Sequence, residues 1–223
     1  SAWVMKQAKQ PQAVADFIHN MGIMSFIDPV YALCVGSFES NVYEMVSAYS
    51  TFANEGVYTT PIFVTHIEDR QGNLLATFIP PTEDAISEQT AYTMLGMLQN
   101  VVRAGTAGRL RWAYNVTGEV GGKTGTSNEN RDAWFVGVTP NLVAGAWCGG
   151  EDQSVHITGT GEGGAALALP IFGRFITKVY ADPRLGVKPT DTFSRPNNVV
   201  VYDCDEENRQ QEAETEIQDE FFD

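Results

Sequence analysis

The residues Gly121-Gly122-Lys123-Thr124-Gly125-Thr126-Ser127 carry more chemical information than any other stretch of this 223-residue chain. Their small and β-branched side chains predict a strand that another backbone can approach closely, because Gly125 has no side chain. An extended peptide can pair with the edge of such a strand and so add a strand to the sheet. The stretch therefore predicts a peptide-binding edge.

The same residues offer the groups that acyl transfer needs, which are donors for an oxyanion and a charge that neutralises an anionic substrate. Lys123 supplies the cation, and the hydroxyls of Thr124 and Thr126 can bind a substrate carboxylate. The amide of Thr126 is the candidate oxyanion donor. The following turn adds three candidates of second rank: Ser127, Arg131 and Asp132. The alternative interpretation is an ordinary edge strand that ends in a turn.

Two further strands follow the first, which spans residues 118–126; they are predicted at 133–139 and 142–148. Pro140-Asn141 joins the last two, and connections this short make neighbouring strands antiparallel. Trp134 and Phe135 alternate along their strand, so one is expected to face the core and the other a helix or solvent.

Helices are predicted before and after these strands from apolar residues at helical spacing. One helix follows Pro11, and a second begins at Asn41 with a capping-box pattern to Glu44. A third runs from Ser87 to a stop before Gly105, and a fourth spans residues 165–180. A glycine-rich irregular stretch is expected after Gly105. Residues 62–68 and 74–78 read as a β-hairpin turning through 70–73. Antiparallel strands with helices before and after indicate the α+β class.

The net charge of −14 is concentrated at one end of the chain. Residues 203–223 hold ten of the 28 acidic residues and one of the 14 basic residues. This segment has almost no aliphatic residues and is expected to be a mobile acidic tail. The rest of the chain is only mildly acidic, which argues against a nucleic-acid partner.

No metal or cofactor site is predicted. Cys34, Cys148 and Cys204 are odd in number and widely spaced, and the three histidines are scattered. Residues 159–164 match the Gly-X-Gly-X-X-Gly spacing of a dinucleotide site, but the acid at the right distance, Asp182, falls at a helix end instead of a second strand. No apolar run approaches the ~18 residues that cross a bilayer.

Several segments, taken in order, resemble the transpeptidase domain of class A penicillin-binding proteins, the enzymes that cross-link bacterial peptidoglycan. They are residues 45–56, 67–69, 105–107, 122–126, 131–137, 163–165 and 170–171. The resemblance assigns residues 1–190 to the C-terminal portion of that domain and leaves 191–223 as an extension. It implies the fold shared by serine β-lactamases and these transpeptidases, an antiparallel sheet flanked by helices, here incomplete.

The family uses three motifs, and only Lys123-Thr124-Gly125 is present. Ser-X-X-Lys, with the nucleophile and its lysine, and Ser-X-Asn are absent, since none of the ten serines opens either one. The chain is therefore expected to be inactive alone, because a serine nucleophile needs a base within reach. Two of the family's five strands are also absent. An unpaired edge at 142–148 is expected, together with self-association or pairing with the absent N-terminal part.

The resemblance implies a D,D-transpeptidase that takes the stem peptide ending in D-Ala-D-Ala, is acylated by β-lactams and uses no cofactor. It places the parent protein on the outer face of the bacterial inner membrane. In that protein an N-terminal membrane anchor and a glycosyltransferase domain would precede the transpeptidase domain. A non-catalytic peptide-binding module of the same fold is the alternative. A D,D-carboxypeptidase or serine β-lactamase shares the Lys-Thr-Gly strand but fits residues 105–107 and 131–137 less well.

Overall fold

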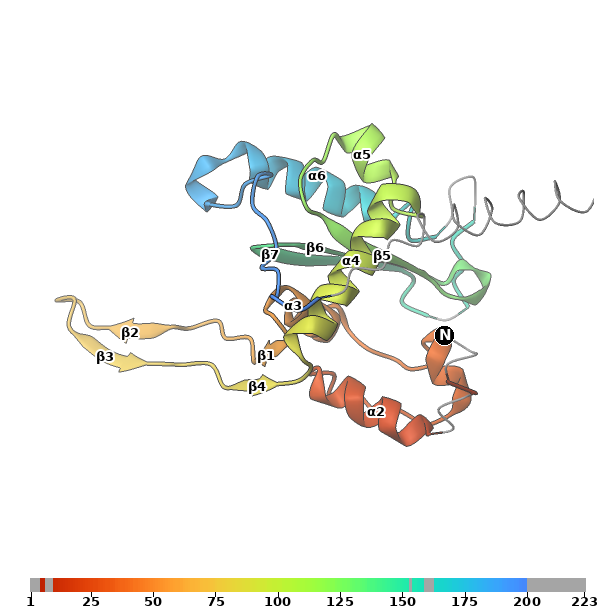
Figure 1. Ribbon diagram of the computed structural model, residues 1–223, viewed down its shortest axis with the longest axis horizontal. Coiled ribbons are helices and arrows are strands. Elements are labelled where there is room, and N and C mark those ends of the chain that lie inside the picture. The colour runs from red at the N-terminus through yellow and green to blue at the C-terminus, as the bar shows by residue number, and fades with distance from the viewer. Residues whose placement is uncertain (1–4, 7–9, 153, 159–162, 200–223) are drawn as a thin grey trace, which may run out of the picture.

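The computed structural model describes residues 5–6, 10–152, 154–158 and 163–199. A central sheet lies between two pairs of helices, with α5 and α6 on one side and α3 and α4 on the other (Figure 1). A long two-stranded arm projects from this body, and α2 (Pro11–Asn20) lies near the N-terminus. The α+β fold predicted from the sequence is confirmed.

The central sheet consists of β5 (Gly121–Thr126), β6 (Asp132–Thr139) and β7 (Leu142–Gly149), in that order and antiparallel. All three predicted strands are present. The first begins three residues later than predicted, because Gly118 has a φ of +78° that breaks the extended backbone. Within the described residues β5 and β7 each pair only with β6, so the outer edge of each is unpaired.

The two faces of the sheet pack against different helices. On one face Phe135 contacts Phe172 of α6 (Ala168–Ala181), with ring centroids 5.2 Å apart. On the other, Val46 of α3 (Val42–Ala53) lies over Gly145, and α4 (Glu88–Ala104) packs against β5. Of Trp134 and Phe135, Phe135 is the residue that faces the core, and Trp134 lies on the opposite face of the sheet, as the alternation of side chains along a strand predicts.

The helix α3 differs from its prediction in two respects. Asn41 caps it by accepting the Glu44 amide at 2.9 Å, but the Glu44 side chain does not return to Asn41. The predicted apolar stripe is only partly buried, and the buried residues are instead Glu44, Ser47, Ala48 and Thr51. The reason is that α3 packs on two sides, against the sheet and against a separate core cluster that includes Ala48.

The arm comprises residues 57–84. β2 (His66–Glu68) pairs with β3 (Leu74–Thr77), which confirms the predicted hairpin. Nearer the body, β1 (Val57–Thr59) pairs with β4 (Thr82–Asp84); neither strand was predicted, since each has three residues and β4 is acidic. The exposed large apolar side chains of the arm are Ile62, Phe63, Val64, Ile67, Leu74, Leu75, Phe78 and Ile79.

Shorter elements complete the body. The stretch after Gly105 contains α5 (Arg109–Tyr114), so the prediction of an irregular segment there was wrong; Leu110 is fully buried and holds this short helix in place. Single 3₁₀ turns lie at Tyr31–Val35, Asn128–Asn130 and Pro183–Leu185. None of the helices within the described ranges has the length and apolar character of a membrane span.

The predicted boundary near residue 190 falls on a segment that remains attached to the body. Phe193 is buried with Leu95, Leu98 and Val138, and its amide donates to Glu119 Oε2 at 2.7 Å. The acidic tail predicted for residues 203–223 lies outside the described residues.

Candidate functional site at the open edge of β5

The backbone of β5 divides into two sets of hydrogen-bonding groups. The Ser127 amide donates to the Asp132 carbonyl at 3.1 Å, and bonded and non-bonded pairs alternate along an antiparallel ladder. Lys123 and Gly125 therefore direct their backbone groups toward β6. Those of Thr124 and Thr126 point to the open edge. The amide predicted as the oxyanion donor thus lies on the side that a guest strand would approach.

Lys123 and Thr124 lie along this edge; Lys123 is exposed and Thr124 is half-buried. The exposed Lys123 ammonium donates to the Thr124 carbonyl at 2.8 Å, so it lies along the open edge. The Thr124 hydroxyl is 2.8 Å from the hydroxyl of Thr106, which lies in the loop after α4. Thr106 was not predicted as a site residue. Its only signal in the sequence was that residues 105–107 are one of the segments that resemble the transpeptidase family.

Thr126 and Gly125 meet the loop that precedes α6. The Thr126 hydroxyl accepts the Gly164 amide at 3.0 Å. A Cβ built on Gly164 would clash with the carbonyl oxygens of Trp134 and Gly125, so only glycine fits against β5 there. The predicted contact of the Thr126 hydroxyl with a substrate carboxylate stays a prediction. In the structure this hydroxyl already accepts the hydrogen bond from the Gly164 loop. Residues 159–162 of the dinucleotide-like pattern lie outside the described residues.

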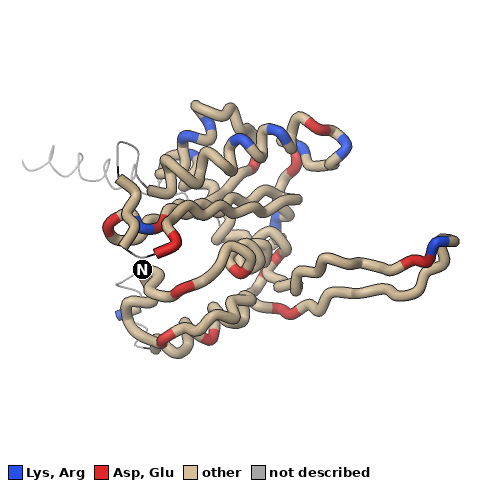
Figure 2. Tube along the Cα trace, turned by 180° about the vertical axis from the view of Figure 1, so that it is seen from behind, with Lys and Arg blue, Asp and Glu red and all other residues tan. Residues whose placement is uncertain are grey.

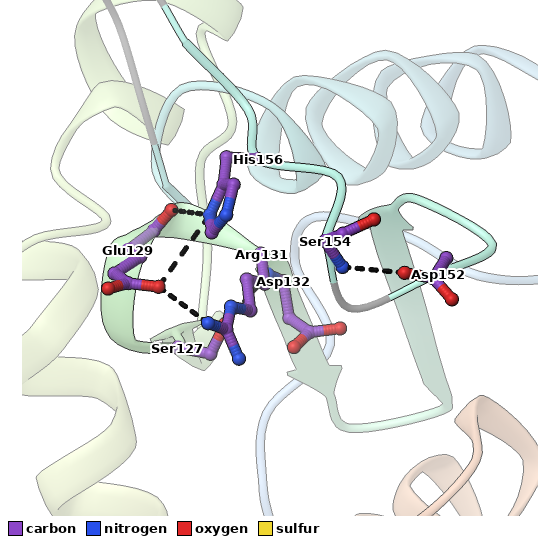
Figure 3. Close-up of polar contacts among 7 residues, drawn as sticks. All are labelled: Ser127, Glu129, Arg131, Asp132, Asp152, Ser154 and His156. Carbon is purple, nitrogen blue, oxygen red and sulfur yellow. Dashed lines mark hydrogen bonds and ion pairs between the residues drawn. The ribbon is translucent and has the colours of Figure 1, made fainter.

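The three second-rank candidates take different places. The Ser127 hydroxyl accepts the Asp132 amide at 2.7 Å and closes the β5–β6 turn, while Asp132 Oδ1 accepts the Trp147 indole N–H at 2.8 Å. Arg131 pairs with Glu129, at 2.6 Å, and Glu129 also lies 3.8 Å from His156 (Figure 3). Ser127 and Asp132 therefore have structural partners, and their contact with a substrate stays a prediction.

The turn itself is conformationally unusual. Glu129 and Asn130 have φ values of 59° and 55°, in the left-handed region that residues other than glycine seldom adopt. The Asn130 carbonyl accepts the Ile157 amide at 3.0 Å, and His156 Nδ1 lies 3.2 Å from the Glu129 carbonyl. The segment 154–158 thus holds the turn from outside (Figure 3).

A cavity of ≈ 640 Å³ lies beside the open edge. Its floor is the sheet face that carries Lys123, Gly125, Trp134 and Trp147, and its opposite wall is formed by residues 36–42 with Met45 and Tyr49 of α3. The sequence predicted Lys123 and Gly125 as site residues but gave no sign that residues 36–42, which are more than 80 positions away, face them.

Glu44 holds this wall in position. The residue is 8% exposed, and its carboxylate accepts the amides of Met24 and Ser25 and the hydroxyls of Ser25 and Ser40 at 2.6–3.1 Å. Burial raises the pKa of Glu44, but these hydrogen bonds outweigh burial and leave the pKa below its usual 4.5. A single carboxylate thereby joins residues 24–25 to the start of α3.

The side chains at the site are suited to binding and electrostatic stabilisation. Within the described ranges, no three His, Cys, Asp or Glu side chains converge as a metal site would require. The donors on the open edge and the ammonium of Lys123 can bind an extended peptide and stabilise a developing negative charge.

Comparisons with known proteins agree with this geometry. Residues 31–147 match the family model described as the penicillin binding protein transpeptidase domain. Penicillin-binding protein 1A of Aquifex aeolicus is 32% identical over 179 residues, which cover 78% of this chain and 23% of that protein. The chain spans about a quarter of the length of such curated relatives.

Solved structures share this fold. Penicillin-binding protein 1A from Haemophilus influenzae matches with a TM-score of 0.75 at 24% identity, over 85% of this chain and 33% of that one. PonA1 from Mycobacterium tuberculosis, in complex with penicillin V, matches with a TM-score of 0.66 at 26% identity, over 86% of this chain and 54% of that one.

Proposed function

Because this chain belongs to the penicillin-binding protein transpeptidase family, we propose that it is the part of a peptidoglycan D,D-transpeptidase that holds the stem peptide. One observation supports the proposal above all others. The edge strand that carries Lys123, Thr124 and Gly125 has an unpaired side, and a cavity of ≈ 640 Å³ lies beside it.

The proposed reaction is acyl transfer through a serine that lies on polypeptide outside this chain. The serine oxygen attacks the carbonyl between the two D-alanines, the bond to the terminal D-alanine breaks, and D-alanine leaves with a proton on its amine. The amine of a second stem peptide then attacks the resulting ester and releases the serine. The same serine attacks the carbonyl of a β-lactam ring, the ring opens, and the resulting acyl-enzyme persists.

Each residue of the β5 edge has a proposed role in that sequence. The stem peptide adds to β5 as a strand, with its backbone bonded to Thr124. The Thr126 amide donates to the oxyanion, and the Lys123 ammonium stabilises nearby negative charge. The hydroxyls of Thr124 and Thr126, with Ser127 at the end of the strand, bind the terminal carboxylate. Trp134 and Trp147 form the floor on which the bound segment lies.

The parent protein is proposed to act at the outer face of the bacterial inner membrane, where its substrate is assembled. An N-terminal anchor and a glycosyltransferase domain would belong to the polypeptide outside this chain. The partners of the site are then the D-Ala-D-Ala stem peptide and β-lactam antibiotics, and the partner of the fold is the N-terminal part of the same domain.

The test is the rate of acylation of the complete protein by a fluorescent penicillin. Lys123→Ala should lower the second-order rate constant by about 100-fold, the size of effect that loss of one electrostatic stabiliser has on such reactions. Lys178→Ala, on the exposed side of α6, is the matched control and should leave the rate unchanged. Equal rates for the two variants would remove Lys123 from the site.

The 223-residue chain alone serves as a second test. It should bind no penicillin covalently, since no serine within it lies beside an activating lysine in the required motif. Covalent labelling of this chain would place the nucleophile within it and contradict the proposal. Absence of labelling in the complete protein as well would favour a non-catalytic peptide-binding module.

A further inference from the structure

The turn between β5 and β6 directly follows Thr126, the proposed oxyanion donor, and its backbone is strained. Glu129 and Asn130 are consecutive residues with side chains, and both have a positive φ, at 59° and 55°. This left-handed conformation is unfavourable for residues other than glycine, and it persists where the surrounding structure holds it. Contacts from outside the turn are therefore expected to maintain its shape.

The turn is joined tightly to the end of β5. The Asn130 amide donates to the Ser127 carbonyl at 3.2 Å, and the Ser127 hydroxyl accepts the Asp132 amide at 2.7 Å. Ser127 is the residue after Thr126, the last residue of β5. A change in the backbone angles of the turn is therefore passed to the last residues of β5, where the candidate donor lies.

The segment 154–158 reaches both strained residues. The Ile157 amide donates to the Asn130 carbonyl at 3.0 Å, and His156 Nδ1 lies 3.2 Å from the Glu129 carbonyl oxygen. A carbonyl oxygen only accepts, so Nδ1 carries the hydrogen in this contact. The His156 side chain is 37% exposed and points at the turn in Figure 3.

The Glu129 side chain strengthens the same contact. Its carboxylate lies 2.6 Å from the Arg131 guanidinium and 3.8 Å from His156 Nδ1. Arg131 belongs to the turn itself, whereas His156 comes from a segment 27 positions away. The connection from β7 to α6 also holds the other end of this stretch, because the Gly164 amide donates to the Thr126 hydroxyl. The end of β5 is thus held both before and within the turn.

We propose that His156 is a positioning residue for acyl transfer. Its hydrogen bond to the Glu129 carbonyl fixes the β5–β6 turn and so keeps the Thr126 amide directed at the open edge. The inference rests on the proposed function, because it takes the Thr126 amide as the donor to the oxyanion. Such a donor acts on the charge that develops in the transition state, so its displacement slows acylation more than it weakens substrate binding.

The first test is acylation of the complete protein over a range of fluorescent penicillin concentrations. His156→Leu removes the donor and should lower the rate constant at saturation roughly tenfold, with less than about a twofold change in the half-saturating concentration. His156→Asn places an amide N–H where Nδ1 lies and should stay within about threefold of the unmodified protein. Packing alone would instead make leucine the milder substitution.

Ser154→Ala is the control from the same segment. Ser154 faces Asp152 instead of the turn (Figure 3), so this variant should be acylated at the rate of the unmodified protein.

The second test is amide hydrogen exchange over residues 127–132 without penicillin. Exchange at the Ser127 and Asn130 amides should be at least about fivefold faster in His156→Leu and unchanged in His156→Asn. This measurement needs no reaction, so an unmodified protein that is not acylated would contradict the proposed function while exchange still reports on the turn. Equal behaviour of the leucine and asparagine variants, or faster exchange with normal acylation in His156→Leu, would overturn the proposal.

Discussion

The central sheet and the arm are both antiparallel and both rich in apolar residues, but they differ in what covers them. Phe135 in β6 is 0% exposed beneath α6, whereas Phe63 in the arm is 89% exposed. Helices pack on both faces of the sheet, whereas the arm meets α3 near its base, through β1 and a stacking contact between Tyr43 and Phe63, and projects away from the body beyond that point (Figures 1 and 2). A strand pattern alone therefore does not determine how much a strand contributes to stability; the layers around it do.

The difference also locates the candidate site. The open edge of β5 belongs to the packed sheet, so Lys123, Gly125 and Thr126 are held by β6, α4 and the Gly163–Gly164 loop. The edges of the arm have no such support. Binding groups placed on a rigid element keep their geometry, which favours β5 over the arm as a site for chemistry.

The largest predicted effect is the removal of a core side chain from the sheet. Phe135→Ala should lower the free energy of unfolding by about 3–5 kcal/mol, because it leaves a cavity against Phe172. Leu75→Ala in the arm should change it by less than about 0.5 kcal/mol. Denaturant titration measures both, and similar losses at the two sites would invalidate the comparison.

The next effect concerns the wall opposite β5. Glu44→Ala should cost about 2–3 kcal/mol, because it leaves buried donors from Met24, Ser25 and Ser40 without their acceptor. Glu83→Ala on the exposed arm is the matched control and should be nearly neutral. Equal stabilities of the two variants would contradict the role assigned to Glu44.

The pH dependence of the same pair gives an independent check. Since the folded pKa of Glu44 is below its usual 4.5, its contribution is complete above pH 4.5 and is lost as the pH falls through the lowered folded value. The stability difference between the unmodified chain and Glu44→Gln should therefore shrink on acidification. A difference that stays constant from pH 7 to pH 3 would show that the carboxylate charge is irrelevant.

Two glycines sharpen the comparison further. Gly164→Ala should destabilise by about 1–3 kcal/mol, because the added Cβ meets backbone atoms of Trp134 and Gly125. Gly72→Ala, in the turn of the arm, meets no atom within 4 Å and should cost only about 1 kcal/mol for its φ of +83°. Thermal unfolding measures both, and a larger loss at Gly72 would reverse the ranking.

The smallest effect is confined to the tip of the arm. Hydrogen bonds from Asn73 and Gln71 lower the pKa of Asp69, so this turn should lose order only as the pH falls below the usual 3.8. Carbon chemical shifts of residues 69–73 should then change without a change in those of β5–β7. Simultaneous change in both regions would indicate that the arm and the body unfold together.

Much of the fold was predictable because its signals are local. The three sheet strands, the hairpin and the helices after Pro11, Asn41, Ser87 and in 165–180 follow from periodicity, short turns and caps. The strands β1 and β4 were not predictable, since each has only three residues and the residues that pair are 23 to 27 positions apart in the sequence. The helix α5 was obscured by the glycines around it.

The candidate site divides in the same way. Lys123, Thr124, Gly125 and Thr126 could be predicted as site residues because four adjacent residues carry the signal, and their roles stay predictions. The wall at residues 36–42 and the glycine contact at Gly164 were not found, because they reach β5 only through tertiary packing. The role of Glu44 was misassigned to a capping box because sequence spacing cannot show that Ser25 and Ser40 lie closer to its carboxylate.

The most direct test of the central claim is amide hydrogen exchange along β5 in the complete protein, before and after acylation by penicillin. Docking at the open edge predicts slower exchange at Thr124 and Thr126, whose amides point away from β6, and little change at Lys123 and Gly125, which β6 already protects. Unchanged exchange at Thr124 and Thr126 in the acylated protein would contradict the claim that this edge receives the substrate.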